Sequence, residues 1–201
     1  MNTIRSICVY CGSSPGRDPI HMASAEALGR SMAEAGIRLV YGGGTKGIMG
    51  AVADAVHRGG GAVTGIIPRF LIHKEASEAE LGSLDELHVT DNMHQRKHMM
   101  FEHSDAFVAL PGGIGTLEEL IEIMTWSQLG RHAKPIAIAN IAGFWDPLLG
   151  LIDHMADAGF IHTAHQVRPL VIDRAEEIVP AILAAAPHPA EQEGSDDIKR
   201  M

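Results

Sequence analysis

The chain has 201 residues, of which 46% are hydrophobic, so it can bury one sizeable core. Its formal net charge of −9 at pH 7 argues against a nucleic-acid partner, because phosphate backbones attract clustered basic residues. No apolar run approaches the roughly 18 residues of a membrane span and no signal-peptide core stands near residue 1, so we expect no membrane partner and a cytoplasmic location.

Short apolar runs of strand length alternate with segments of helical periodicity along the chain. The predicted strands cover residues 4–10, 37–41, 62–67, 106–110, 136–139 and 170–172, with a weaker candidate at 84–89. The predicted helices cover residues 19–35, 46–58, 93–103, 116–129, 145–158 and 175–185. This alternation predicts an α/β fold, with a mainly parallel sheet flanked by helices on both faces. We expect a single domain over residues 1–186 and a disordered, polar tail over 187–201.

The two cysteines, Cys8 and Cys11, form a C-x-x-C pattern that is also found in redox proteins. They fall on or beside the first predicted strand, where residues three apart have Cα atoms roughly 10 Å apart. A disulfide needs Cα atoms within roughly 7 Å. We therefore expect two free thiols with no redox function.

Three loops that follow predicted strands are rich in small residues, at 11–16, 42–47 and 111–116. Ligands of parallel α/β sheets bind beside the carboxyl ends of the strands. Glycines let the backbone come close to an anion, and the first amides of a helix bind phosphate. The loops therefore predict a site for a phosphate-bearing ligand. From the first two loops we expect contacts from Ser13, Gly43, Gly44 and Thr45.

The second loop also matches two nucleotide-binding signatures in part. Gly42, Gly44 and Gly47 satisfy G-x-G-x-x-G between a strand and a helix. A dinucleotide site also needs an acidic residue about 20 positions further on, and residues 62–68 contain none. A P-loop needs a lysine where this chain has Ile48. We therefore expect phosphate binding without NAD, and no cofactor.

The third loop leads into a predicted helix and has two interpretations. Its glycines and helix start repeat the phosphate-binding pattern of the second loop, so that both loops would hold one phosphate. Alternatively, Thr116 is the N-cap of the helix and Glu119 reaches back to it, as in a capping box. The residues alone leave both interpretations open.

The predicted helix at 93–103 carries two adjacent cations, Arg96 and Lys97, close to its start. Cations at a helix N-terminus oppose the helix dipole, and an anionic ligand would explain their position. His94 and His98 stand four residues apart on the same helix, but Gln95 occupies the position of the glutamate in the zinc motif H-E-x-x-H. We expect no metal at this segment.

These segments resemble the LOG family, the cytokinin riboside 5′-monophosphate phosphoribohydrolases that are often mislabelled as lysine decarboxylases. The family signature P-G-G-x-G-T-x-x-E is matched from Pro111 to Glu119, and the similarity extends over roughly residues 4–180. Further matching segments are 8–14, 41–50, 93–97, 103–110 and 125–135. The resemblance implies a Rossmann-like fold, a homodimer with sites close to the subunit interface, and a nucleoside 5′-monophosphate as substrate.

The resemblance also assigns functions to individual residues. Arg96 and Glu119 would form the catalytic pair, and the other substrate contacts would come from Glu75, Lys97, Gly113, Ile114, Gly115, Thr116, Glu118 and Thr125. Cleavage of an N-glycosidic bond builds positive charge on the ribose, so Glu119 would stabilise that charge while Arg96 holds the phosphate or ribose. Ile114 stands where the family usually has tyrosine, and the stretch between Glu75 and Met93 is about three residues longer than in plant members.

The expected reaction is hydrolysis of N6-modified adenosine 5′-monophosphates and AMP to free base and ribose 5-phosphate. Two alternatives stay open, a general purine 5′-monophosphate nucleosidase and a nucleotide-binding protein without catalysis. A decarboxylase using pyridoxal phosphate would need a Schiff-base lysine, and no lysine of the chain stands in a context that requires this function. The candidates are Lys46, Lys74, Lys97, Lys134 and Lys199.

Overall fold

The structure, a computed structural model, describes residues 4–75, 84–161 and 168–186. The tail expected to be disordered, residues 187–201, lies outside the described residues. No helix of the described part is long and apolar enough to span a bilayer.

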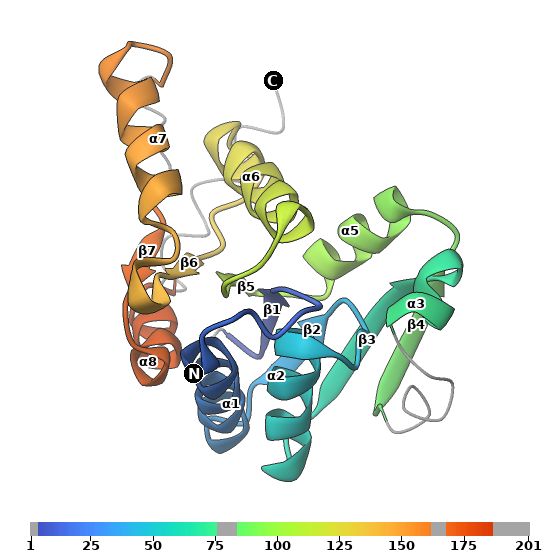
Figure 1. Cartoon of the computed structure of the whole chain (residues 1–201). Helices are drawn as coiled ribbons and strands as arrows, with labels where there is room; N and C mark the ends of the chain where they lie inside the picture. Colours follow the sequence, from blue (N-terminus) through green and yellow to red (C-terminus); the bar gives the residue numbers. More distant parts are fainter. Residues whose placement is uncertain (1–3, 76–83, 162–167, 187–201) are drawn as a thin grey trace.

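Seven parallel strands form one sheet in the order β4-β3-β2-β1-β5-β6-β7. The strands are β1 (Ser6–Tyr10), β2 (Arg38–Tyr41), β3 (Val63–Pro68), β4 (Glu86–Thr90), β5 (Ala106–Ala109), β6 (Ile136–Ala139) and β7 (Leu170–Ile172). The chain builds one half of the sheet outward from β1 to the edge strand β4, and then returns to place β5 on the other side of β1 (Figure 1). Ile7 accordingly lies opposite both Leu39 and Ala106. The strand order reverses between β1 and β5, which is where such sheets bind ligands.

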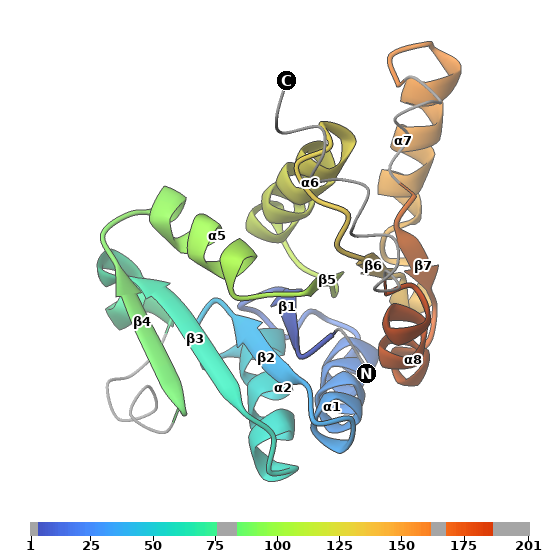
Figure 2. The ribbon, with the colours of Figure 1, turned by 180° about the vertical axis from the view of Figure 1, so that it is seen from behind.

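Helices cover both faces of this sheet. They are α1 (Pro19–Glu34), α2 (Gly47–Arg58), α3 (Ile72–Glu75), α5 (Met93–Glu102), α6 (Ile114–Gln128), α7 (Asp146–Asp157) and α8 (Ala175–Ala184), with short 3₁₀ turns at Arg69–Leu71 and Ile141–Gly143. In Figure 1, α1, α2 and α8 lie below the sheet and α5 and α6 above it, while α7 projects beside α6. Figure 2 shows the same division from behind.

The alternation of side chains along β1 explains the two layers. Ile7 and Val9 point into a buried cluster with α1, α2 and α8, whereas Cys8 and Tyr10 point into a second buried cluster with α5 and α6. A central parallel strand must be apolar on both faces because helices cover both. The predicted α/β fold with a parallel sheet between two helical layers is confirmed.

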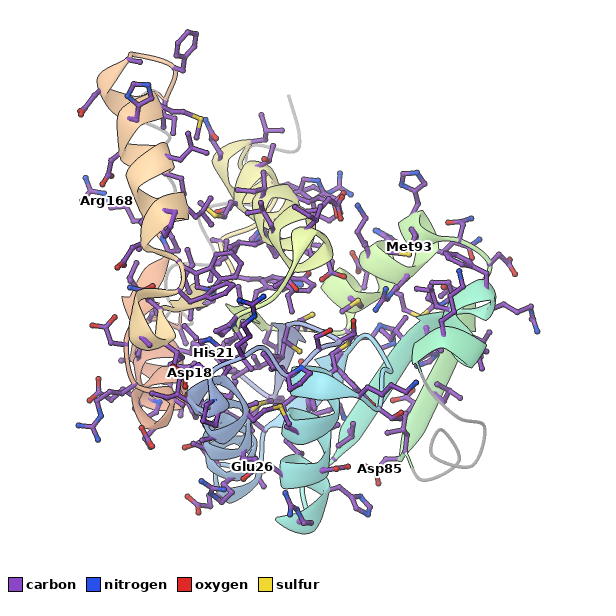
Figure 3. All side chains as sticks on the ribbon, viewed as in Figure 1. Asp18, His21, Glu26, Asp85, Met93 and Arg168 are labelled. Atoms are coloured by element: carbon purple, nitrogen blue, oxygen red, sulfur yellow. The ribbon has the colours of Figure 1, made fainter. Side chains whose placement is uncertain are left out.

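The local signals at the ends of the helices also explain where the chain turns. Asp18 accepts a hydrogen bond from the amide of Ile20, and Pro19 occupies the first helical position of α1 (Figure 3). At α5, Asn92 Oδ1 accepts from the amide of Gln95 at 2.9 Å, while the Gln95 side chain accepts from the amide of Asp91 at 2.9 Å. Gln95 therefore has a capping function at the position where the zinc motif would need glutamate.

Two sequence-based interpretations change. The weak strand candidate at 84–89 is a real strand, but it spans Glu86–Thr90 and forms the sheet edge. The capping box at Thr116 is wrong, because α6 begins at Ile114 with Gly113 as N-cap and no side-chain cap. Thr116 instead lies buried in the first turn of the helix. The glycine-rich sequence lets the helix start two residues earlier than its apolar stripe suggests.

Candidate active site

A cavity of about 380 Å³ lies at the carboxyl ends of β1 and β5, between the starts of α5 and α6. It occupies the point where the strand order reverses, as expected for this fold. Its lining residues are Val9, Tyr10, Cys11, Gly12, Ser13, Gly42, Met49, Leu71, Met93, Arg96, Met100, Gly113, Ile114, Gly115, Thr116, Glu118 and Glu119. Met93, the first residue of α5, is labelled in Figure 3.

Three glycine-rich loops interlock beneath this cavity. We call them the β1 loop (11–16), the β2 loop (42–47) and the β5 loop (111–116). The amide of Gly12 donates to the carbonyl of Pro111 at 3.1 Å, and the Gly12 carbonyl accepts from the amide of Met49 at 3.2 Å. The β1 loop is thus bonded to the β5 loop and to the first turn of α2, directly after the β2 loop.

Arg96 is the buried cation of the site, with only 6% of its surface exposed. Its Nε donates to the carbonyl of Ile66 at 3.2 Å and its Nη2 donates to the carbonyl of Gly42 at 3.1 Å. A Cβ atom on Gly42 would collide with this guanidinium, so glycine is required there for Arg96 to dock. Two neutral acceptors orient the planar fork without neutralising its charge, which leaves a cationic group suited to an anion.

Glu119 approaches the same cavity from the second turn of α6 and is half-buried. Arg96 on α5 and Glu119 on α6 are 23 positions apart in the sequence, yet both line this one cavity. The first residues of α6, Ile114, Gly115 and Thr116, line it as well. The first turn of α6 contains no acidic residue, so its amides and dipole present a positive potential to the cavity.

Lys97, the neighbour of Arg96 on α5, contacts acidic side chains of α6 rather than backbone carbonyls. Its Nζ lies 2.5 Å from Glu118 Oε1 and 3.0 Å from Glu122 Oε1, so it ties α5 to α6. Burial alone would lower the pKa of Lys97, but the hydrogen bonds and charges of the two glutamates raise it above its ordinary value. Lys97 is not among the lining residues of the cavity, whereas Glu118 is.

Other residues expected at the site lie off the cavity. Thr125 is exposed further along α6 and donates its hydroxyl to the carbonyl of Ile121 at 2.7 Å. Thr45 lines a separate cavity of about 110 Å³, and Gly43 and Gly44 line neither. Glu75 is the last residue of α3, and its side chain lies outside the described part of the chain.

Sequence reasoning missed several lining residues. Gly42 was recognised as part of a glycine loop, but nothing local indicates that its carbonyl anchors Arg96, 54 positions away. Its place directly after β2 was the available signal.

Met49 and Leu71 carry no motif, because apolar side chains at a binding site follow the same pattern as those in a core. Met93, Met99 and Met100 were candidates for contacts to an N6 substituent, and Met93 and Met100 line the cavity.

The C-x-x-C pair is confirmed as two free, buried thiols. Burial is the main cause that raises the pKa of Cys8 and of Cys11 well above the usual range of a thiol, and the negative charge of Glu119 is the second cause. Burial, followed by the charges of Cys8 and Glu119, also raises the pKa of Tyr10. All three groups are therefore neutral near pH 7, and the wall beside Glu119 is an uncharged, poorly hydrated surface.

None of the residues that line the described cavity is a lysine. Lys97 is held by two carboxylates, and Lys134 donates to the carbonyl of Phe101 at 2.8 Å with its Nζ 4.0 Å from the centre of the Phe101 ring. Lys46 is the N-cap residue of α2. Lys74 is exposed on α3, and Lys199 lies outside the described residues.

Comparisons of the sequence with known proteins all indicate the same family. A family model described as "Possible lysine decarboxylase" matches residues 49–182. The chain is 48% identical over 168 residues to the cytokinin riboside 5′-monophosphate phosphoribohydrolase LOG of Oryza sativa subsp. japonica, covering 84% of this chain and 67% of the rice protein. It is 45% identical over 183 residues to the cytokinin riboside 5′-monophosphate phosphoribohydrolase LOG3 of Arabidopsis thaliana, covering 91% of this chain and 84% of that protein.

Among solved structures, the fold matches a molybdenum cofactor binding protein from the phototrophic bacterium Rippkaea orientalis. The TM-score is 0.66, and the alignment covers 92% of this chain and 98% of the other. At 22% identity, this similarity concerns the fold alone.

Proposed function

The chain belongs to the LOG family of cytokinin riboside 5′-monophosphate phosphoribohydrolases, and we propose that it hydrolyses the N-glycosidic bond of N6-modified adenosine 5′-monophosphates and AMP. The products are the free base and ribose 5-phosphate. One observation carries the proposal: a buried arginine and a half-buried glutamate, Arg96 and Glu119, line the same cavity at the switch point of the sheet. No resident cofactor is needed, because hydrolysis requires only water as the second reactant.

The phosphate of the substrate fits the start of α6. Ile114, Gly115 and Thr116 of its first turn line the cavity, and glycine on either side of Ile114 lets an anion approach the backbone. The absence of an acidic residue from the first helical turn keeps this end positive. The start of α6 is therefore the phosphate subsite of the proposal.

Arg96 would hold the phosphate or the ribose so that the scissile bond faces Glu119. Its guanidinium is already oriented by the carbonyls of Gly42 and Ile66, so little conformational entropy is lost when substrate binds. An arginine does not give up its proton near pH 7. Its function is therefore to position the substrate and complement its charge rather than to act as an acid.

Glu119 would stabilise the reacting sugar. When the bond between C1′ and the base nitrogen breaks, the electron pair leaves with the base and positive charge develops on the ribose ring. A carboxylate against this charge, in the low-polarity surroundings formed by Tyr10 and Cys11, stabilises the transition state strongly. A water molecule then supplies the oxygen at C1′ and the hydrogen that ends on the base.

Base preference would depend on the apolar part of the cavity. Met93 and Met100 on α5 and Leu71 before α3 form a wall that suits a flat base with an apolar N6 substituent. Ile114 stands at the entrance and is 82% exposed, in the position where the family usually has tyrosine. We propose that this change alters which N6 substituents bind best.

Lysine decarboxylation, the activity in the description of the family model, is not supported by the site. That chemistry needs a lysine that can form a Schiff base beside the substrate. Arg96, rather than a lysine, is the cation that lines the described cavity.

We further propose a homodimer. Large apolar side chains are exposed on α6 and at its C-cap, with Ile121 at 38% and Leu129 at 77%, and on α7 and the turn that follows it, with Leu151 at 52% and Phe160 at 81%. Figure 1 shows these two helices on the same side of the molecule. Burial of such a surface against a second copy would be favourable. An Ile121→Asp/Leu129→Asp variant should elute as a monomer in size-exclusion chromatography with light scattering, and an unchanged mass would reject this face.

The proposal includes a cytoplasmic location and no nucleic-acid partner. Two free thiols in the described residues suit a reducing compartment, and the net charge of −9 opposes binding to a phosphate backbone.

A chromatographic assay for free base tests the proposed reaction. The purified chain is incubated with AMP, GMP, CMP and isopentenyl-adenosine monophosphate. We expect base release from the adenine nucleotides, most rapidly from the N6-modified one. Equal rates with GMP would favour the general purine nucleosidase, and binding of AMP without base release would favour the non-catalytic alternative.

A further inference from the structure

Two histidines and a glutamate converge at the edge of the sheet, away from the cavity. Glu86 and His88 belong to the edge strand β4, and His103 directly follows the last residue of α5. One ligand atom of each residue lies within 4.8 Å of the other two. Within residues 4–75, 84–161 and 168–186, this is the only group of three or more His, Cys, Asp and Glu side chains arranged in this way.

The backbone places these side chains on one face. Residues two apart on a strand point to the same side of the sheet, so Glu86 and His88 are neighbours. The ring centres of His88 and His103 are 5.0 Å apart, which places the end of α5 against this side of β4. We call the three residues the β4–α5 site.

The two carboxylate oxygens of Glu86 have different partners, the sheet for one and His88 for the other. Its Oε2 accepts from the hydroxyl of Thr64 at 3.1 Å and lies 3.6 Å from Arg38 Nη1. Its Oε1 lies 2.9 Å from His88 Nε2. The body of the protein thus anchors the oxygen that faces β3, while the second oxygen is directed at the histidine pair.

His103 is oriented by its own helix. Its Nδ1 lies 2.9 Å from the carbonyl of Met99, which can only accept, so Nδ1 carries the proton and Nε2 carries the lone pair. Metal-binding histidines usually have this arrangement, with the second ring nitrogen donating to a backbone carbonyl or a carboxylate. Two of the three side chains are therefore already held by outer hydrogen bonds.

We propose that Glu86, His88 and His103 bind one divalent transition-metal ion, Zn²⁺ in particular, which joins the edge strand to the end of α5. Two imidazoles and a carboxylate suit zinc better than magnesium or calcium, which prefer oxygen ligands alone. Zinc lies about 2.0–2.2 Å from such ligands, so tetrahedral ligand atoms are roughly 3.4 Å apart. The three ligand atoms already lie within 4.8 Å of one another, and Glu86 and His103 are exposed, so small rotations of their side chains can adjust the distances while water takes the fourth position.

The β4–α5 site is separate from the proposed active site. Glu86 is the first residue of β4, whereas the cavity lies at the carboxyl ends of the strands. His103 follows Arg96 by seven positions, which corresponds to roughly 10 Å along a helix. The ion would therefore stabilise the edge of the sheet without contacting substrate.

Zinc titration of the untagged full chain tests this inference. The parent for all comparisons carries His94→Ala and His98→Ala, because two histidines four positions apart on α5 can bind zinc themselves. Every further variant is made in this parent. In isothermal titration we expect one Zn²⁺ per chain, with at least a tenfold loss of affinity in His88→Ala and in His103→Ala. His57→Ala, an exposed histidine on α2, is the matched control and should bind zinc as before.

Two further measurements make the inference sharper. Thr64→Val removes the outer hydrogen bond to Glu86, together with the one that the Thr64 hydroxyl accepts from Arg38, and leaves all three metal ligands in place. It should weaken zinc binding roughly tenfold, as loss of outer partners does at other zinc sites. Zinc should also raise the melting temperature of the parent chain but not of His88→Ala, with circular dichroism verifying that each variant is folded. Equal zinc affinity in the parent, His88→Ala and His103→Ala would overturn the proposal, whatever the outcome of the nucleotide assay.

Discussion

The β2 loop and the β5 loop have similar glycine-rich sequences and yet differ in what their glycines make room for. In the β2 loop the neighbours are protein atoms. A Cβ atom on Gly42 would collide with Arg96, and one on Gly47 would lie 2.5 Å from the backbone carbon of Ser13. The Gly42 carbonyl accepts from the arginine, so the β2 loop binds a cation of the protein itself.

In the β5 loop only Gly112 is packed against protein atoms, where a Cβ atom would collide with Thr116, whereas the space beside the other two glycines is open. A Cβ atom on Gly113 or Gly115 would meet no atom within 4 Å, and both glycines line the cavity. We infer that this space is kept for the ligand. Glycine thus serves internal packing in the β2 loop and at Gly112, and substrate access at Gly113 and Gly115. A glycine pattern by itself cannot distinguish these two uses.

The largest effect is expected at Glu119, which the β5 loop and α6 bring to the cavity. Glu119→Ala should lower kcat for AMP by roughly 10³-fold, because the developing charge on the ribose loses its carboxylate. Release of adenine is measured by chromatography. Glu34→Ala, an exposed glutamate at the end of α1, serves as control. Near-normal turnover in a folded Glu119→Ala variant would remove the residue from the mechanism.

The next effect is expected at Arg96, which the β2 loop anchors. Arg96→Ala should lower kcat/KM by an amount equivalent to about 2–4 kcal/mol of transition-state stabilisation. Arg96→Lys should recover only part of this loss, because lysine lacks the planar fork that contacts Gly42 and Ile66. A change of less than twofold would show that the β2 loop holds a structural arginine only.

The fold could be predicted because its signals are local. Apolar runs separated by helical periodicity gave the strands and the long helices within a few residues, and Gly113 was recognisable beside the start of a helix. The start of α6 itself was misplaced, because Thr116-Leu117-Glu118-Glu119 also satisfies a capping box. In the structure Thr116 packs against Gly112, which in turn lies against Gly12 of the β1 loop, and this second contact joins residues 100 positions apart.

The details of the site could not be predicted, because they depend on residues far apart in the sequence. Lys97 has the same local surroundings as Arg96, yet it meets Glu118 and Glu122, which lie 21 and 25 positions further on. Arg96 meets Gly42, 54 positions earlier. Two adjacent cations on a helix point in different directions, about 100° apart, and only the positions of α6 and β2 decide which one reaches the cavity.

Gly42→Ala tests the β2 side of the comparison without altering any functional group. The added methyl group would displace the Arg96 guanidinium, so we expect kcat/KM to fall roughly 10- to 30-fold and the protein to lose about 1–3 kcal/mol of stability from overpacking. Nucleotide kinetics and urea unfolding measure the two effects. If both remain at the wild-type level, the glycine at this position is not required for Arg96 to dock.

Gly115→Ala tests the β5 side, and its expected effect is the smallest. The methyl group meets no protein atom, and alanine is the better helix former inside α6, so the melting temperature should stay constant or rise slightly. The same methyl group would project into the space that we assign to substrate, so KM for AMP should rise about 3- to 10-fold with little change in kcat. A loss of stability at Gly115 together with unchanged KM would reverse the assignment, because the open space would then serve the protein rather than its ligand.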